Sequence, residues 1–391
     1  MDASLWALGL RPFYLLAAIF ALLAIPVWLA SYVGLLHWSG YLQGPAWHSH
    51  EMVFGFAAAV MCGFLLTAVR NWTGQATLSG AGLAALATLW VMARLTAVTG
   101  PATLSALIDS AFLPALAIAI AIPIRRSRNV RNYKILLVLA GLSAVNILYH
   151  LSWSGVLPGE ITQLAIRIAL DMITLLMAIV AGRVIPAFTA NAVPEAHPRH
   201  NKGIEIVALG SLLLILAGDI TGHWFSLGYS LAGAGWGMLF ALAAAAHGIR
   251  LFLWQPQRTM HNPLLWMLPM AYSWIPISLA LRAVEQASGV PSAAAVHALT
   301  LGAISSLMVA MMARSALGHT GRELKAGWIE ISAFLLIQLA AIMRVAATLI
   351  PPVYYRGAVI LSGTLWALAF ALFLSRYWGY LTRPRIDGRP G

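Results

Sequence analysis

Residues 47–69 read WHSHEMVFGFAAAVMCGFLLTAV, and the fold prediction starts from this stretch. Between Met52 and Val69 no side chain is charged, so the run approaches the roughly 20 residues that a helix needs to cross a bilayer. Its apolar residues follow one another without the polar alternation of a membrane β-strand. The stretch therefore predicts a membrane-spanning helix that carries His48, His50 and Glu51 at its mouth.

Apolar runs of this kind recur from one end of the chain to the other. Hydrophobic residues make up 61% of the 391 residues and charged residues only 9%, whereas about 25% of a soluble domain is charged. We predict an all-α, polytopic membrane protein in which about twelve transmembrane helices form one bundle, a single domain over residues 1–391. The expected spans are 12–36, 47–69, 79–99, 103–124, 133–154, 161–186, 203–221, 228–250, 263–285, 292–315, 327–349 and 355–378.

The positive charges of the chain are distributed unevenly between the expected loops. With twelve spans, the loops on one side hold nearly all the Lys and Arg residues outside the spans, and Arg356 is the exception on the other side. Cytoplasmic loops of membrane proteins carry this excess, so both termini are expected in the cytoplasm. The same rule accounts for the net charge of +12 without a nucleic-acid partner, and no such partner is expected.

The expected topology sorts the histidines by side. Those at outer ends of spans or in outer loops are His37, His48, His50, His150, His223 and His297, and those on the cytoplasmic side are His197, His200, His247, His261 and His319. Ionisable groups within spans are costly and usually functional, so we predict that the outer histidines form a metal or haem site. Imidazole ligands without cysteine suit haem or copper. Zinc, or a hydrated cation pathway without a bound metal, is the alternative.

His48 and His50 cannot both face one ligand from a regular helix, because they point about 200° apart. Either they serve two centres, or one is a ligand and the other packs or forms hydrogen bonds. Glu51 lies three residues after His48, on nearly the same face. There it could accept the second ring N–H of a ligating histidine, or carry protons. Asn146, four residues before His150, is expected to orient that histidine.

Several charged side chains fall inside the expected spans. The arginines are Arg94, Arg167, Arg282 and Arg344, and the acids are Asp109 and Asp171. Either these groups pair with one another, or some of the arginines hold haem propionates, which a guanidinium binds through two hydrogen bonds. Asp109, like Glu51, is a candidate catalytic proton carrier.

A second candidate site lies on the cytoplasmic side. His247 and Arg250 share a face at the end of their span, and residues 313–324 read ARSALGHTGREL. Arg183 shortly precedes Pro186, which is expected to kink or end its helix. These residues could form an inner haem or anion site, a proton entry, or only an interlocked loop structure.

Four motifs, in order along the chain, resemble the NnrS family, and the similarity covers essentially the whole chain. They are LGLRPFYLLAA (8–18), WHSHEMVFGFAAAVMCGFLLTAVRNWTG (47–74), GRVIPAFT (182–189) and HALTLGAISSLMVAMMARSALGHTGREL (297–324). Members of that family are described as haem- and copper-containing bacterial inner-membrane proteins of twelve spans, associated with the response to nitric oxide. The chain departs from the family pattern at Arg70, where the pattern has proline, and at Pro269, where it often has histidine.

The resemblance implies functional weight for the residues at matching positions, which are His48, His50, Glu51, Arg183, His297, Arg314, His319 and Arg322. It implies haem b and copper as cofactors and a bacterial inner-membrane location. Taking all candidates together, we expect the metal ligands to be His48, His50, His150, His223 and His297. We expect the cofactor contacts to be His48, His50, His297, His247, His319, Arg94, Arg183, Arg314, Arg322 and Arg344.

Three functions are compatible with these residues. The first is an oxidoreductase that reduces or otherwise converts nitric oxide at a haem and a histidine-bound copper, with protons from buried carboxylates. Its electrons would come from quinol or another external donor, because the chain has no Cys-x-x-Cys-His motif. The second is a protective protein that binds nitric oxide or metal without turnover. The third is a metal-ion or proton transporter with a histidine-lined path, which an internal inverted repeat would favour.

Overall fold

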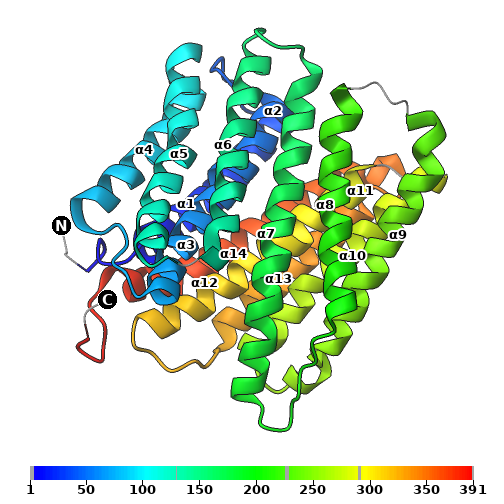
Figure 1. Ribbon diagram of the computed structural model, residues 1–391. Helices are drawn as coiled ribbons and strands as arrows, with labels where there is room; N and C mark the ends of the chain where they lie inside the picture. The colour runs from blue at the N-terminus through cyan, green and yellow to red at the C-terminus, as the bar shows by residue number, and fades with distance from the viewer. Residues whose placement is uncertain (1–3, 129, 225–228, 289–291, 390–391) are drawn as a thin grey trace. The chain divides into compact units, whose positions relative to one another are not determined.

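The structure, a computed structural model, is built from helices (Figure 1). It describes residues 4–128, 130–224, 229–288 and 292–389, and the side chains of 222–224, 229–234, 288 and 292 lie outside the description. No strand occurs among the described residues. Within the described ranges, twelve helices are long and apolar enough to cross a membrane, which confirms the predicted all-α polytopic fold.

The helices follow the apolar runs closely. In chain order they are α1 (Leu10–Tyr32), α2 (Gly44–His50), η1 (Glu51–Ala57), α3 (Ala58–Thr73), α4 (Gly80–Thr99), α5 (Ala102–Arg126), η2 (Val130–Asn132), α6 (Tyr133–Trp153), α7 (Glu160–Ala192), α8 (Lys202–Trp224), α9 (Tyr229–Leu253), η3 (Pro256–Thr259), α10 (Pro263–Ser288), α11 (Ser292–His297), η4 (Ala298–Ser305), α12 (Ser306–His319), α13 (Trp328–Ala346) and α14 (Pro352–Thr382). Of the η segments, η1 and η4 are π-helices and η2 and η3 are short 3-10 helices.

The chain divides into two compact units. Unit 1 comprises Met1–Ala169, Met312–Leu324 and Phe370–Gly391, and unit 2 comprises Leu170–Met311 and Lys325–Ala369. Within unit 1, α1 packs on α3, and α5 packs on α3, α4 and α6. Within unit 2, α9 packs on α8 and α10, and η4 contacts α10 and α13. The single domain over residues 1–391 stays a prediction.

Prolines lie inside several helices without ending them. Pro186 lies within α7, which continues to Ala192. Pro114 and Pro269 lie in the same way inside α5 and α10. Membrane helices tolerate proline because neighbouring helices and polar side chains satisfy the freed backbone groups. In these helices the length of the apolar run, and not the proline, therefore decides where the helix ends.

Two spans are more enclosed than the other candidate spans, and both contain a π-helix. The apolar window of Gly44–Thr73 is 89% buried and that of Ala293–His319 is 78% buried, against at most 61% elsewhere. In each span a short α-helix ends at a histidine, His50 or His297, and a π-helix follows. π-Helical turns are rare and occur mostly at functional sites. Their position directly after His50 and His297 therefore marks these two histidines as candidate functional residues.

Two arginines of unit 2 pair with carboxylates inside or at the ends of spans. Arg250 holds Glu205 through two hydrogen bonds, Nε to Oε1 and Nη2 to Oε2, each of 2.7 Å. Arg282 lies 3.3 Å from Asp171 and 3.4 Å from Asp219. Charges at membrane depth need such partners. These pairs agree with the prediction that buried charged groups pair with one another.

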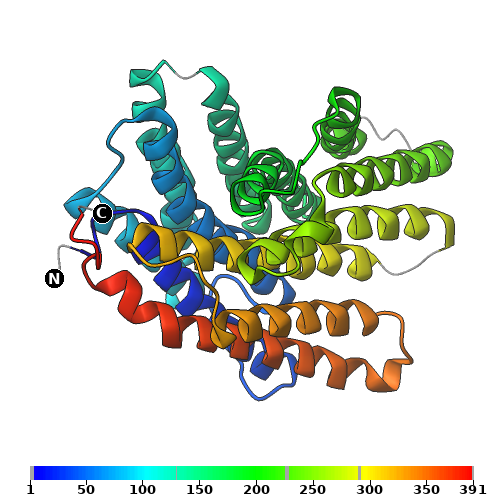
Figure 2. The same cartoon turned by 90° about the horizontal axis from the view of Figure 1, so that it is seen from below.

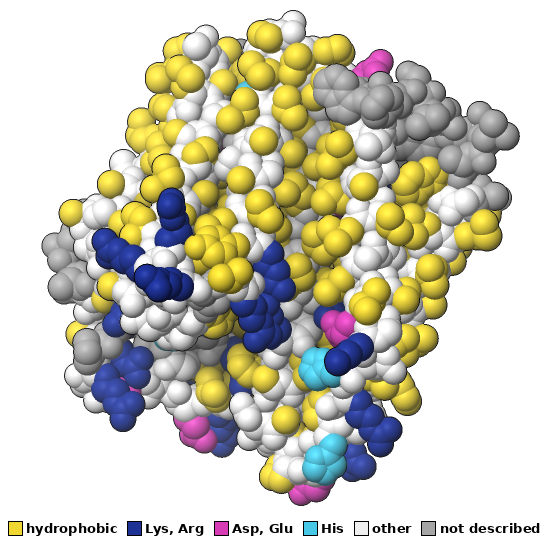
Figure 3. Space-filling view, in the orientation of Figure 1, with side chains coloured by type: hydrophobic (Ala, Val, Ile, Leu, Met, Phe, Trp, Pro, Cys, Tyr) yellow, Lys and Arg dark blue, Asp and Glu magenta, His cyan; other side chains and the backbone are white. Residues whose placement is uncertain are grey.

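The surface suits a lipid environment. Hydrophobic side chains are spread over the face seen in Figure 3, and charged side chains occur there in patches. Leu107, Leu137 and Ile206 are 65%, 73% and 72% exposed. Large apolar side chains with this exposure would be costly in water but are the normal covering of a helix that contacts lipid.

Candidate metal centre

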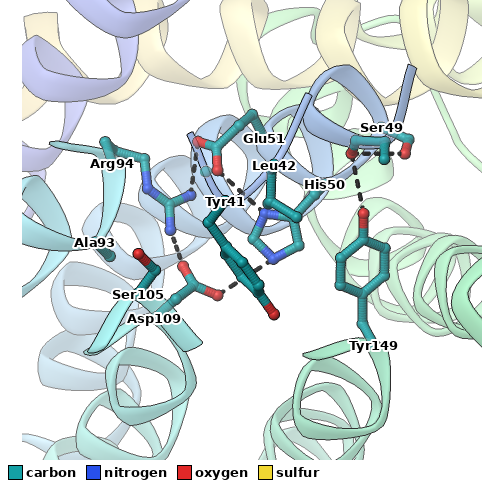
Figure 4. Close-up of polar contacts among 12 residues, drawn as sticks. Tyr41, Leu42, Ser49, His50, Glu51, Ala93, Arg94, Ser105, Asp109 and Tyr149 are labelled. Carbon is teal, nitrogen blue, oxygen red and sulfur yellow. Dashed lines mark hydrogen bonds and ion pairs between the residues drawn. The ribbon is translucent and has the colours of Figure 1, made fainter. Parts of the chain in front are cut away.

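Helices of unit 1 bring five ionisable side chains together in a buried cluster, here called the His50 cluster. His50 ends α2, Glu51 begins η1, Arg94 lies on α4, Asp109 on α5 and His150 on α6, and all five are buried. Figure 4 shows His50 between Glu51 and Asp109, with Arg94 joining the two carboxylates. The cluster therefore unites residues that are far apart in the chain.

Both histidines lie close to the same carboxylate oxygen of Asp109. Its Oδ2 atom lies 3.2 Å from Nε2 of His50 and 2.9 Å from Nε2 of His150. Asn146 donates a hydrogen bond from Nδ2 to the same oxygen at 2.7 Å, and Oδ1 of Asn146 lies 3.1 Å from Nε2 of His50. Two imidazoles and an amide thus converge on a single carboxylate oxygen.

The hydrogen-bond partners of His50 call for a positive charge at its Nε2 atom. Nδ1 lies 3.1 Å from Oε1 of Glu51, which accepts when ionised, so Nδ1 carries the proton of the neutral ring. Nε2 then has a lone pair, yet it faces two further acceptors, Oδ1 of Asn146 and Oδ2 of Asp109. The conflict is resolved either by a further proton, on His50 or on Asp109, or by a cation that Nε2 and Oδ2 bind together.

The charges of the cluster lead to the same requirement. Arg94 lies with Nη1 3.0 Å from Oε2 of Glu51, and its Nη2 pairs with Oδ1 of Asp109. With both carboxyl groups ionised, two negative charges face one positive charge. A buried net charge is strongly unfavourable, so one more positive charge, a proton or a metal ion, completes the site.

The ligand atoms have the spacing of a metal site. His50, Asp109 and His150 each offer one ligand atom, and these atoms lie within 4.8 Å of one another. Two imidazoles and one carboxylate suit copper, zinc or iron(II) with further positions open to a small molecule. Glu51 accepts from the other ring nitrogen of His50, which is the support that metal-bound imidazoles usually have.

Tyr41 supports His150 from the loop between α1 and α2. Its hydroxyl lies 3.2 Å from Nδ1 of His150, and burial raises the pKa of Tyr41 to about 12, so the hydroxyl keeps its proton at neutral pH. Trp153 donates from Nε1 to the carbonyl oxygen of Tyr41 at 2.8 Å. Gly40 lies so close to the carbonyl of Val98 that a Cβ atom there would overlap it, and this close approach fixes the loop.

Gly55 in η1 allows Arg94 to reach the cluster. A Cβ atom at this position would lie 2.7 Å from Nη1 of Arg94 and 2.9 Å from Oε2 of Glu51, inside contact distance. We expect Gly55→Ala to displace one of these groups and to destabilise the protein by about 1–3 kcal/mol, measured as a lower Tm. Gly379→Ala in α14 is the control, because nothing lies within 4 Å of its Cβ position. Equal effects of the two substitutions would contradict this explanation.

The metal-ligand roles predicted for His48, His297 and His223 stay predictions. His48 stacks on Trp28, with ring centroids 4.4 Å apart, so His48 and His50 have different surroundings. His297, in unit 2, donates from Nδ1 to the carbonyl oxygen of Ala293 at 2.7 Å, which leaves Nε2 as its lone-pair nitrogen. The side chain of His223 lies outside the described residues.

His247 has protein partners at both ring nitrogens. Nε2 donates to the carbonyl oxygen of Ala208 at 3.0 Å, and Nδ1 accepts from the hydroxyl of Tyr272 at 2.6 Å. Nη1 of Arg250 donates to the same hydroxyl at 2.9 Å. Since both nitrogens are used, His247 acts here as part of a hydrogen-bond network that joins α8, α9 and α10.

The remaining predicted cofactor contacts belong to several helices of the two units. Arg344 lies with Nη2 3.3 Å from the hydroxyl of Tyr355, and the guanidinium of Arg322 lies 3.8 Å from the ring centre of Tyr380. His319 and Arg314 lie on α12, and Arg183 lies on α7. None of these contacts links them to the His50 cluster; their cofactor roles stay predictions.

Of two further contributors to the site, Tyr41 lacked a sequence signal and Asn146 had one that pointed to another partner. Tyr41 lies in a loop, GYLQGP, that resembles any outer connection. Asn146 has the predicted spacing to His150, but the structure has it contact His50 and Asp109. Its position one helical turn before a histidine was the signal, and only the packing of α5 and α6 shows which groups it serves.

Comparison with known proteins agrees with the sequence motifs. A search among proteins of curated function gave no match. The model of the family described as NnrS protein matches residues 4–385, nearly the whole chain. This multi-pass membrane protein therefore belongs to the NnrS family.

Proposed function

We propose that this chain is an inner-membrane metalloprotein of nitric oxide metabolism, with copper held by His50, Asp109 and His150. One observation carries the proposal: the Nε2 atoms of both histidines converge on one oxygen of Asp109, while Nδ1 of His50 is committed to Glu51. Membership of the NnrS family supports the connection with nitric oxide.

Copper and haem b fit the His50 cluster differently. Imidazole and carboxylate ligands in a small, buried site suit a single copper ion. A porphyrin needs a flat space on at least one side of its axial ligand. Two imidazole nitrogens that both lie within 3.2 Å of one oxygen leave no such space between them. We therefore assign copper, and not haem, to this cluster. His48 and His297 remain the candidate haem ligands.

The residues of the cluster have distinct tasks in this proposal. A bound copper ion supplies a position for a diatomic ligand and exchanges one electron at a time. Arg94 holds Glu51 and Asp109 in place, and Glu51 orients His50. The reduction of two molecules of nitric oxide to nitrous oxide and water consumes two electrons and two protons. Quinol or another external donor would supply the electrons, and Asp109 and Glu51 are the nearest groups that could pass protons.

A protonated His50 satisfies the same hydrogen bonds, and this observation favours proton or metal-ion transport as the second candidate. A third candidate is a protein that binds nitric oxide or metal protectively, without turnover. The test is to count copper and haem in the purified protein and to follow nitric oxide with an electrode after adding reductant. Copper near one per chain with sustained, catalytic consumption supports the enzyme, and consumption that stops after one equivalent supports the binder. Protein without copper or haem, after expression with both in excess, contradicts the proposal and favours transport.

A further inference from the structure

One end of unit 1 gathers positive charge from segments that are far apart in the chain. Arg11 lies at the start of α1, Arg322 follows α12 and Arg385 follows α14, and Figure 2 shows these segments side by side. The charges of Arg385 and Arg322 act on Arg11, and those of Arg385, Arg70 and Arg11 act on His319. These five residues are here called the Arg11 cluster.

The C-terminal segment is fixed to the loop after α12. The N–H of Ile386 donates to the carbonyl oxygen of Thr320 at 3.3 Å, and Nη1 of Arg385 donates to that of His319 at 3.1 Å. Arg385 also holds Asp387 through Nε to Oδ1 at 2.8 Å and Nη2 to Oδ2 at 2.5 Å. These hydrogen bonds lower the pKa of Asp387 to about 2. Since that carboxylate is committed to Arg385, the cluster keeps an excess of positive charge.

One edge of the Arg11 guanidinium has no hydrogen-bond partner among the described residues. The side chain is fully buried, and its Nη1 donates to the carbonyl oxygens of Leu381 at 3.1 Å and Arg383 at 2.7 Å. Nε and Nη2 have no hydrogen-bond partner among the described residues. Nε and Nη2 form the edge with which a guanidinium binds an oxyanion through two hydrogen bonds. Arg385 and Arg250 of this chain each use that same edge to hold a carboxylate.

We propose that the Arg11 cluster binds an oxyanion of the phosphate type. Two of its oxygens accept hydrogen bonds from Nε and Nη2 of Arg11, and the charge of Arg322 holds it further. The phosphate belongs either to the headgroup of an anionic phospholipid or to free phosphate. The charge distribution predicts that this end of the chain faces the cytoplasm, where basic pockets between helices commonly hold anionic headgroups. Because Arg11 also binds the C-terminal segment, the ligand would fasten that segment to α1.

The experiment uses the full chain, delipidated in non-ionic detergent, and follows Tm by tryptophan fluorescence. Three probes are titrated at constant ionic strength: dioctanoylphosphatidylglycerol, dioctanoylphosphatidylcholine and inorganic phosphate. We expect a saturable rise in Tm with phosphatidylglycerol or inorganic phosphate and none with phosphatidylcholine. A response to phosphatidylglycerol alone identifies a lipid ligand, and a response to inorganic phosphate as well identifies a free oxyanion.

Two variants and one control test the residues. Arg11→Lys keeps the charge but lacks the two-nitrogen edge, so we expect the apparent affinity to fall at least about tenfold. Arg322→Gln removes one charge of the cluster and leaves Arg11 unchanged. If Arg11→Lys fails to fold, the apparent affinity of Arg322→Gln for the anionic probe provides the test. Arg126→Gln is the control, because Arg126 is exposed at the end of α5. No stabilisation by any anionic probe overturns the proposal, as does unchanged affinity in the folded variants.

Discussion

Copper binding should fall by at least about 100-fold when His150 is replaced by glutamine, because even an outer-shell partner of a metal ligand usually contributes 10–100-fold. Nε2 of His150 lies 2.9 Å from Oδ2 of Asp109, and the substitution removes one of three proposed ligand atoms. It leaves the ion pairs of Arg94 with Asp109 and Glu51 in place, so the fold should persist. The measurement is competition for copper against a chelator of known affinity, together with copper counted per chain.

Asp109→Asn tests the charge of the same site. It keeps the shape of the side chain but removes the carboxylate that faces both histidines. The affinity for copper should therefore fall by about as much as in His150→Gln. His37→Ala is the control, because His37 is an exposed histidine of the loop between α1 and α2. Full copper content in both His150→Gln and Asp109→Asn would show that the metal lies elsewhere. A loss that is equal in all three variants would point to a general loss of protein quality.

The spans could be predicted from sequence because the bilayer imposes one simple requirement on every helix. A continuous apolar run of sufficient length must form a helix, since lipid offers no hydrogen bonds to the backbone. The expected span 47–69 corresponds to the observed Gly44–Thr73, and 263–285 to Pro263–Ala287. The differences lie at the ends: these two helices extend beyond the expected spans, whereas in the expected spans 12–36 and 327–349 the helix ends earlier, at Tyr32 and Ala346.

The site could be predicted only as a set of candidates. His50, His150, Glu51 and Asp109 were recognisable as costly ionisable groups in the expected spans or at their ends. Which of them meet depends on how each helix is rotated against its neighbours, and hydropathy carries little of that information. His48 has the same chemistry as His50 but stacks on Trp28.

The change from α2 to η1 shows most directly what could not be predicted from the sequence. In a regular helix Glu51 lies near the face of His48, three residues earlier. The chain instead passes into a π-helix at Glu51, and Glu51 contacts Nδ1 of its neighbour His50. The sequence EMVFGFA has no feature that marks a π-helix. The importance of Gly55 follows only from the packed structure, in which its small size allows Arg94 to approach η1.

Arg94→Met should destabilise the protein by about 3–5 kcal/mol, because removing one partner of a buried ion pair leaves an uncompensated charge. Arg94 is 7% exposed and pairs with both Glu51 and Asp109, so two carboxylates lose their counter-charge at once. The expected result is a much lower Tm in detergent and a poor yield from the membrane. Arg126→Met at the exposed end of α5 is the matched control and should leave Tm nearly unchanged.

A second substitution separates lost charge from lost packing. In Arg94→Met with Glu51→Gln, one uncompensated carboxylate is removed, so the double variant should be more stable than Arg94→Met alone and the two effects should not add. Added copper should also raise the Tm of Arg94→Met, because an ion bound by His50, Asp109 and His150 replaces part of the missing positive charge. If Glu51→Gln only adds to the damage, and copper leaves Tm unchanged, then Arg94 acts through its packing and not as the counter-charge of the site.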